Sequence, residues 1–188
     1  MNIPSTVTYI GPQFCYVCTS LTSIIIPAQI TTINYNFCIQ CSSLTSVTFL
    51  GQVTTIGNSA FSQCSSLTSI TIPDTVTILE QAAFQSCTSL KSIIIPSSMT
   101  NIDRYAFNGC SSLASVTFSS DSQLSNIGEQ AFTYCSLTSI NIPSTVVSVG
   151  QYAFAGNSGL QTAMIPSTLM GMIDSTTFYN SPVTVTTT

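Results

Sequence analysis

Two pairs of cysteines are the residues whose types and spacing most suggest chemistry. Cys15 and Cys18 form one Cys-x-x-Cys unit, and Cys38 and Cys41 form a second one 23 residues later. Two such units can supply the four thiolates of a zinc ribbon. A disulfide between Cys15 and Cys38 is the other chemistry that this spacing allows, because neighbouring segments of a repeat come within disulfide range. A third interpretation, that these cysteines simply fill space, depends on the repeat described below.

The other reactive side chains do not form a catalytic constellation. The chain has no histidine, which excludes Ser-His-Asp and Cys-His arrangements and every His-ligated metal site. A hydrolytic carboxylate pair needs two acids that face one cleft. The six carboxylates fall instead at different positions of the repeat, at Asp74, Glu80, Asp103, Asp121, Glu129 and Asp174. We therefore predict that the protein is not an enzyme, with no catalytic residue and no cofactor.

A repeat of about 23 residues must position every one of these side chains. The phrase C-S-S-L-T-S-I-T-I-P, at residues 64–73, returns along the whole chain, and a second phrase, V-T-x-I-G-x-x-A-F, precedes each return. The conserved leucine of the first phrase recurs at intervals of 23, 23, 23, 23, 24 and 23 residues, at Leu21, Leu44, Leu67, Leu90, Leu113, Leu137 and Leu160. About eight copies are visible, and the first and last are incomplete.

The columns of this repeat predict the fold. Leu-x-x-Ile-x-Ile places alternate apolar side chains on one side of a short strand, and the following proline ends it. We expect Leu67, Ile70 and Ile72 to be buried along one such strand. No single copy can bury its apolar residues, but stacked copies cover one another. The sequence therefore predicts a β-rich solenoid of about eight right-handed coils, with a single parallel-strand ladder on one face, that spans residues 1–188 as one domain.

Six cysteines occupy one column of the repeat. They are Cys18, Cys41, Cys64, Cys87, Cys110 and Cys135, and the next two copies place Asn157 and Ser181 there. A column that accepts Cys, Asn or Ser requires a small group that hydrogen-bonds to backbone, not a thiolate. We therefore interpret this column as packing, and we expect its thiols to be reduced and metal-free.

The two phrases together resemble the BspA-like, or Treponema-type, leucine-rich repeat family. The pattern of that family, C-x-x-L-x-x-I-x-L-P-x-x-L-x-x-I-G-x-x-A-F, matches nearly the whole chain. The resemblance implies a cell-surface or extracellular protein that binds host, matrix or cell-surface proteins, and it implies no enzyme activity. The chain contains no signal peptide, so a cytoplasmic location is the alternative.

The outward positions of the predicted strands are the candidate contact surface for a protein partner. One outward column is Ile25, Thr48, Thr71, Ile94, Thr117, Asn141 and Met164. It is a polar ladder interrupted by three exposed apolar side chains, which are the first candidates for partner contacts. Tyr105 and Tyr152, which share a column before Ala-Phe, are further candidates because tyrosine is enriched at interfaces.

Composition narrows the choice of partner. Only 4% of the residues are charged, and the chain has two basic residues against six acidic ones. Two cations cannot neutralise a phosphate backbone, which excludes nucleic acid, and no apolar run is long enough for membrane insertion. Scarce charge and an open first strand edge favour the alternative that the protein stacks end to end with itself. The regular Ser-x-Thr ladder adds a more remote alternative, binding to ice or to another crystal surface.

Overall fold

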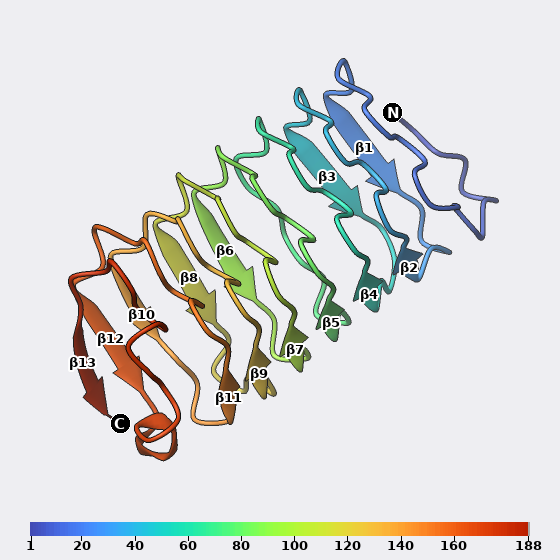
Figure 1. Ribbon diagram of the computed structural model, residues 1–188. Coiled ribbons are helices and arrows are strands. Elements are labelled where there is room, and N and C mark those ends of the chain that lie inside the picture. The colour runs from blue at the N-terminus through green and yellow to red at the C-terminus, as the bar shows by residue number, and fades with distance from the viewer. Residues whose placement is uncertain (188) are drawn as a thin grey trace.

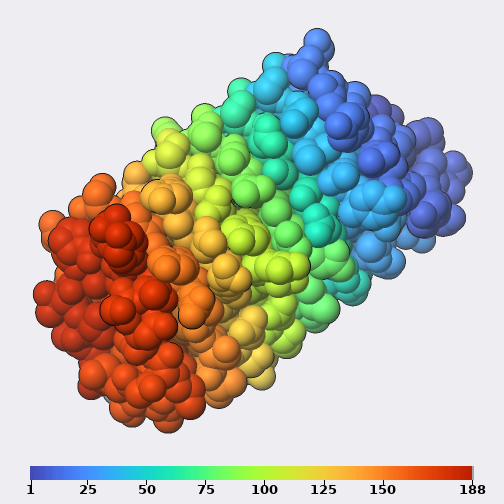
Figure 2. Space-filling view, viewed as in Figure 1, coloured from blue at the N-terminus to red at the C-terminus, as the bar shows by residue number. Residues whose placement is uncertain are grey.

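The computed structural model describes residues 1–187 and shows a rod of stacked parallel coils, each about one repeat long (Figure 1). The N-terminus lies at one end of the rod and the C-terminus at the other, and the coils follow one another along it as continuous bands of colour (Figure 2). The predicted solenoid is thus confirmed, with about seven full turns of about 23 residues; the coils are numbered one to eight below, because the first and last are incomplete.

The predicted strands form one wall of the rod, which we call the strand wall. Paired strands are parallel and lie one repeat apart, so that Ile25 is opposite Thr48 and Ile94 is opposite Thr117. Alternate residues point inward, and Ile24 and Ile26 are fully buried. The strands are β1 (Ser23–Ile26), β3 (Ser46–Phe49), β6 (Ser92–Ile95), β8 (Ser115–Phe118), β10 (Ser139–Asn141), β12 (Thr162–Ile165) and β13 (Thr184–Thr187).

The strand wall is interrupted at two places. Residues 69–72 form no strand, although Ile70 and Ile72 are buried as predicted, and β8 does not pair with β10. Each interruption follows a strand that ends in a phenylalanine, Phe49 or Phe118, at the position where β1, β6 and β12 end in isoleucine. Both rings are only partly buried, because a phenylalanine exceeds the space of the isoleucine column.

A second ladder, on another wall, joins the coils where the strand wall is interrupted. It is one continuous parallel sheet of two-residue strands: β2 (Thr32–Ile33), β4 (Thr55–Ile56), β5 (Ile78–Leu79), β7 (Asn101–Ile102), β9 (Asn126–Ile127) and β11 (Ser148–Val149). The sequence predicted a single ladder, and this sheet adds a second. A 3₁₀ helix, η1 (Ser167–Leu169), supplies a short helical segment in the last third of the chain.

The third wall, which we call the turn wall, is built from one six-residue turn in each coil. The turns cover residues 12–17, 35–40, 58–63, 81–86, 104–109, 129–134, 151–156 and 175–180. Most of these turns hold two residues in the left-handed backbone region, four positions apart, such as Gln13 with φ 58° and Val17 with φ 55°. Thirteen such residues are not glycine, and the conformation costs a non-glycine residue roughly 1–2 kcal/mol.

Hydrogen bonds between coils offset the cost of the left-handed backbone in these turns. At six successive junctions the two left-handed residues and the residue midway between them donate their N–H groups to the next coil. In the fourth coil, for example, Ala82, Phe84 and Ser86 donate to the carbonyls of Arg104, Ala106 and Asn108, with N···O distances of 3.0, 2.8 and 2.8 Å. All of these bonds run from an earlier coil to a later one. The strained turns thus supply a third, one-directional ladder.

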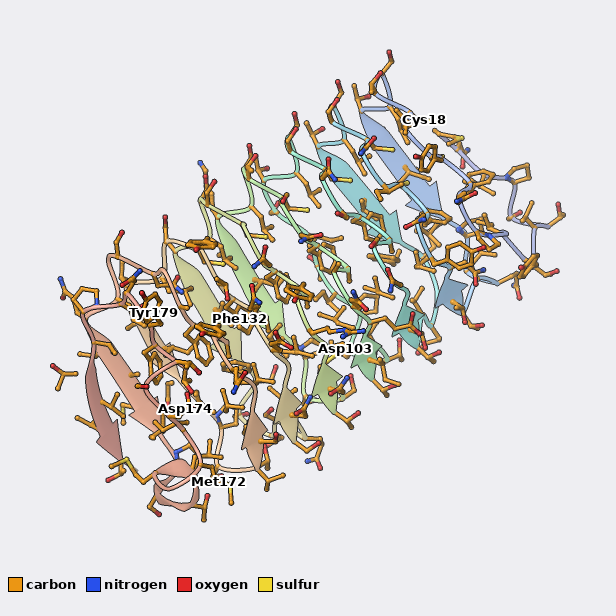
Figure 3. All side chains as sticks on the ribbon, viewed as in Figure 1. Cys18, Asp103, Phe132, Met172, Asp174 and Tyr179 are labelled. Atoms are coloured by element: carbon orange, nitrogen blue, oxygen red, sulfur yellow. The ribbon has the colours of Figure 1, made fainter. Side chains whose placement is uncertain are left out.

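The core is a stack of repeated side chains along the axis of the rod. The Ala-Phe phenylalanines form a column in which Phe84, Phe107, Phe132 and Phe154 stack with centroid distances of 5.2–5.5 Å and interplanar angles of 2–7°. These rings are fully buried, as are the repeat leucines from Leu44 to Leu160. Phe132 can be seen inside the rod in Figure 3. Each coil therefore covers the apolar face of the next.

Candidate functional site

The strand wall exposes the column of side chains that the sequence singled out. Thr48, Thr71, Thr117 and Asn141 are exposed, and the three apolar members, Ile25, Ile94 and Met164, have exposed fractions of 37%, 64% and 42%. Register places Asn141 opposite Met164, as it places Ile94 opposite Thr117. The wall is thus a neutral polar surface on a rigid backbone, with separate aliphatic side chains that project from it.

The first interruption of the strand wall hollows this surface. A depression of about 430 Å³ lies beside β3, and its lining includes Thr48 and Thr71 together with Leu50 and Gln52. Leu50 stands where the strand of the first coil is followed by proline, and its side chain is 62% exposed. Sequence reasoning missed Leu50, although its departure from the Ile-Pro pattern was a usable signal. The depression extends the candidate contact surface toward that leucine.

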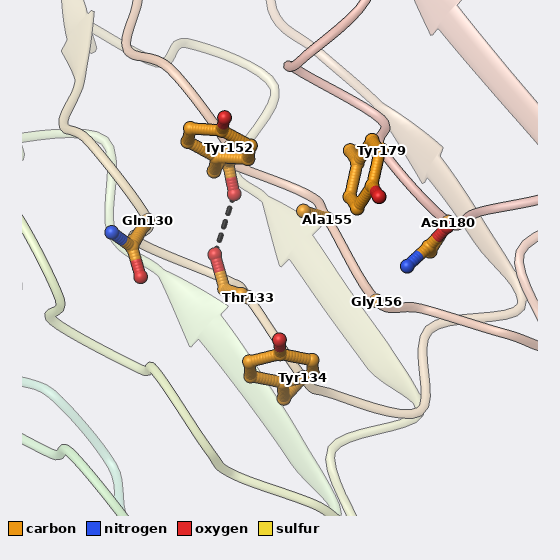
Figure 4. Close-up of a pocket in the computed structure, with 8 residues that line it drawn as sticks. All are labelled: Gln130, Thr133, Tyr134, Tyr152, Ala155, Gly156, Tyr179 and Asn180. Atoms are coloured by element: carbon orange, nitrogen blue, oxygen red, sulfur yellow. Dashed lines mark hydrogen bonds between the residues drawn. The ribbon is translucent and has the colours of Figure 1, made fainter.

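The two candidate tyrosines lie on the turn wall, not on the strand wall. Tyr105 and Tyr152 are each partly buried and hold left-handed backbones with φ 61° and 58°. Tyr152 borders a pocket of about 220 Å³ between the sixth and eighth coils (Figure 4). Tyr134 and Tyr179 line the same pocket, and their rings are 65% and 56% exposed. The structure therefore separates the predicted partner residues into two surfaces.

The cysteine column makes the backbone contact that its composition predicted. Each buried thiol donates to the carbonyl of the Ala-Phe position of the preceding coil, with Sγ···O distances of 3.0–3.3 Å. The pairs are Cys41 with Cys15, Cys64 with Cys38, Cys87 with Phe61, Cys110 with Phe84 and Cys135 with Phe107. In the later coils Asn157 Nδ2 and Ser181 Oγ make the equivalent bonds at 2.9 Å. The column therefore selects for a small donor.

Burial makes these thiols hard to ionise. It raises the pKa of Cys64 and of Cys110 to about 12, and it raises the pKa of Cys87 and Cys135 well above the ordinary value of 9.0. A thiolate has no solvent to stabilise its charge in this core. These cysteines are therefore unreactive in the folded protein near neutral pH.

The four cysteines considered for zinc lie close together in the first two coils. A hydrogen bond with Cys15 raises the pKa of Cys38, and the same bond lowers the pKa of Cys15. Cys15 and Cys38 are buried, whereas Cys18 is exposed at the edge of the rod (Figure 3). Within residues 1–187 the cysteines are free thiols, and no group of three or more His, Cys, Asp or Glu side chains has a metal-binding arrangement.

Alkylation separates the three interpretations of these cysteines. In the native protein at neutral pH we expect iodoacetamide to modify Cys18 faster than the seven buried thiols, because the reagent can reach only an exposed thiol. After unfolding without a reducing agent, all eight cysteines should be modified, as mass spectrometry would show. Two unmodified cysteines would indicate the Cys15–Cys38 disulfide. Stoichiometric zinc in the purified protein would indicate the ribbon.

Two of the acidic side chains, Glu80 and Asp174, accept hydrogen bonds from the backbone of turns. Glu80 accepts a hydrogen bond from the amide of Asn58, with an Oε2···N distance of 2.9 Å. Asp174 accepts from the hydroxyl and the amide of Thr176, and these bonds lower the pKa of its carboxyl group. Asp103 and Asp174 lie on well-separated coils (Figure 3). This scatter agrees with the sequence.

Among residues 1–187, no helix has the length and the apolar composition that crossing a membrane requires.

Comparisons with known proteins agree with this geometry. The model of the BspA-type leucine-rich repeat region matches residues 1–91 and 79–188, which together cover the chain. A leucine-rich cell surface protein from Faecalibacterium prausnitzii A2-165 is 36% identical, with a TM-score of 0.79 over 86% of this chain. A T. pallidum leucine-rich repeat protein is 25% identical, with a TM-score of 0.53 over 77% of this chain. A search of curated proteins finds no match.

A further likeness shows the fold alone. A leucine-rich repeat protein from Bacteroides ovatus is 24% identical, with a TM-score of 0.50 over 95% of this chain. The chain spans 46%, 60% and 58% of the structures from F. prausnitzii, B. ovatus and T. pallidum, so each of those proteins is longer. The repeat, the solenoid and the family match over the whole chain lead to one conclusion: this protein belongs to the BspA-type leucine-rich repeat family.

Proposed function

We propose that this chain is a non-catalytic, protein-binding adhesion module of a cell surface. Its partner would be a host, matrix or cell-surface protein. The proposal is supported by the family and by the described cell-surface location of the F. prausnitzii relative. The observation that carries it is the set of exposed aliphatic side chains on the rigid strand wall.

These side chains have the properties of interface anchors. Ile25, Ile94 and Met164 occupy positions where three other coils carry threonine, so the fold does not require an apolar residue there. Exposed apolar groups on a polar surface are stabilised when a partner covers them. A β wall fixes their backbones before binding, and little conformational entropy is lost when a partner docks. Leu50, beside the depression, enlarges the same surface.

Substitution within the column tests the role of this wall. The triple variant Ile25→Thr, Ile94→Thr and Met164→Thr installs residues that the column already accepts, so the solenoid should fold unchanged. We expect its binding to a surface coated with solubilised extracellular-matrix protein to fall about tenfold or more, because a few buried anchors carry most interface energy. Surface plasmon resonance would measure the change.

A matched control separates this wall from exposed apolar residues in general. Val147 and Ile78 are 62% and 38% exposed on the wall of two-residue strands, in columns where other coils carry Thr, Ser or Asn. Val147→Thr with Ile78→Thr should leave binding unchanged. Equal loss in both variants, or loss in neither, would contradict the assignment of binding to the strand wall.

A further inference from the structure

The pocket on the turn wall has a lining that the proposed adhesion function does not use. Tyr134, Tyr152 and Tyr179 come from three successive coils, and Figure 4 shows Tyr152 and Tyr179 along one side of the pocket and Tyr134 on the other. The rings of Tyr152 and Tyr179 meet edge to face, with centroids 6.2 Å apart and planes at 84°. The pocket therefore presents aromatic surfaces in two orientations to a single ligand.

Backbone geometry holds these rings in place. Gly156 has φ +70°, and a Cβ atom at this position would lie only 2.5 Å from Cδ1 of Tyr134. The Tyr134 ring therefore rests directly against the backbone of the next coil. The amide of Gly156 donates to the carbonyl of Tyr179 at 2.7 Å, and the hydroxyl of Thr133 donates to the carbonyl of Tyr152. The three tyrosines are thus tied together by bonds of the turn wall.

The polar groups of the pocket are neutral. The amides of Gln130 and Asn180 stand at its two ends, and the three phenol groups add further donors and acceptors. Its lining includes no Asp, Glu, Lys or Arg. Such a site offers no cation for a phosphate or carboxylate ligand, and the nearby carboxylate of Glu129 already accepts a hydrogen bond from the amide of Gln130, with an Oε1···Nε2 distance of 3.4 Å. It favours an uncharged molecule with both apolar faces and many hydroxyl groups.

A sugar ring combines these two properties. The C–H groups of a pyranose form an apolar face that stacks on an aromatic ring, while its hydroxyl groups hydrogen-bond to amides and phenols around the edge. The volume of about 220 Å³ is below the roughly 300–1,000 Å³ typical of sites for drug-sized ligands. It suits one ring with the rest of a chain in solvent. We propose that this pocket binds a neutral hexopyranose unit of a glycan.

This site is independent of the strand wall, and so is its test. Neutral methyl glycosides of glucose, galactose, mannose and N-acetylglucosamine would be titrated into the whole chain and followed by ligand-observed NMR. We expect at least one of them to bind with a millimolar dissociation constant, as is ordinary for a single shallow ring site. Glucuronic acid, which has the same ring and a negative charge, should bind more weakly than glucose.

Two variants locate the binding. Tyr134→Ala removes one aromatic face, and Gly156→Ala keeps the ring but displaces it from its seat, so each should weaken the bound glycoside about tenfold or more. Tyr35→Ala, which removes a tyrosine that is 51% exposed on the turn wall of another coil, should have no effect. Circular dichroism would establish that each variant is folded.

Three outcomes would overturn the proposal. They are the absence of binding for every neutral glycoside at tens of millimolar, binding that Tyr134→Ala and Gly156→Ala leave intact, and preferential binding of a proline-rich or aromatic peptide at the same tyrosines. The last result would assign the pocket to a peptide. None of these outcomes bears on the strand wall, because that surface is tested with a different probe and different variants.

Discussion

Phe107→Ala is expected to lower the free energy of unfolding by about 3–5 kcal/mol, the cost of replacing a buried phenylalanine with alanine. Phe107 is fully buried between Phe84 and Phe132, with centroid distances of 5.4 and 5.2 Å and nearly parallel rings. Its removal opens a cavity in a column that the rigid coil spacing prevents from collapsing. Urea unfolding followed by circular dichroism would measure the loss.

Phe14 provides the control, because it occupies an end of the rod and its side chain is 43% exposed. Phe14→Ala removes the same atoms, but it leaves a surface that water can fill, so its cost should be much smaller. Equal unfolding midpoints for the two variants would mean that the buried phenylalanine column does not contribute to stability as we expect.

Alkaline pH should destabilise the protein steeply. The buried thiols of Cys64 and Cys110 have pKa values of about 12, above the ordinary 9.0 that we expect in the unfolded chain. Between these values the native state keeps protons that the unfolded state releases, so stability is fully present below pH 9 and is lost as the pH rises toward 12. Each thiol should remove about 1.4 kcal/mol per pH unit within that range. Urea midpoints at pH 8, 9, 10 and 11 would show the decline.

Serine at the same positions isolates the thiol contribution. Cys64→Ser with Cys110→Ser retains a small donor, as Ser181 does in the same column, but it cannot ionise in this range. The variant should therefore show a flatter decline between pH 9 and 11, whatever its stability at pH 8. Parallel curves for the wild type and the variant would rule out these thiols as the cause, because both proteins share the same tyrosines.

The repeat predicted much of the fold because its columns encode burial directly. The leucine, Ala-Phe and cysteine columns proved to be buried from the second coil to the seventh, and the substitution of Asn157 for cysteine correctly indicated a backbone hydrogen bond. Ile70 and Ile72 were buried as expected, but residues 69–72 did not form a strand. The burial of Ile70 and Ile72 follows from their own apolar side chains. Strand pairing of this segment also depends on the preceding coil, where the bulkier Phe49 ends the strand.

The turn wall was not predicted, because left-handed backbone has a clear sequence signal only when glycine occupies it. Here the positions hold residues such as Gln13, Val17, Ala82 and Tyr105, and only Gly109 and Gly156 carry the usual signature. Their conformation is imposed by the bonds between coils, which are not local.

The tyrosine pocket was missed for a related reason. Tyr134 and Tyr152 fall in different columns of the repeat, and the coils around them depart from the 23-residue period. The register therefore did not reveal that they line one pocket. Tyr152 was singled out together with Tyr105, because the two share a column and because tyrosine is enriched at interfaces. The aromatic character of the site was therefore visible in the sequence, but its assembly was not.

The one-directional bonds of the turn wall give the rod a polarity comparable to that of a microtubule or an actin filament. At six successive junctions, three turn-wall amides of one coil face three carbonyls of the next, as with the donors Gln130, Phe132 and Tyr134. A coil stacked in the reverse orientation would place its turn-wall amides against the amides of its neighbour. An array of these repeats can therefore lengthen only by adding coils that point in the same direction along the rod. The direction of the chain, from N-terminus to C-terminus, is then also the direction of the rod. Equivalent positions on successive coils therefore present their side chains in the same orientation.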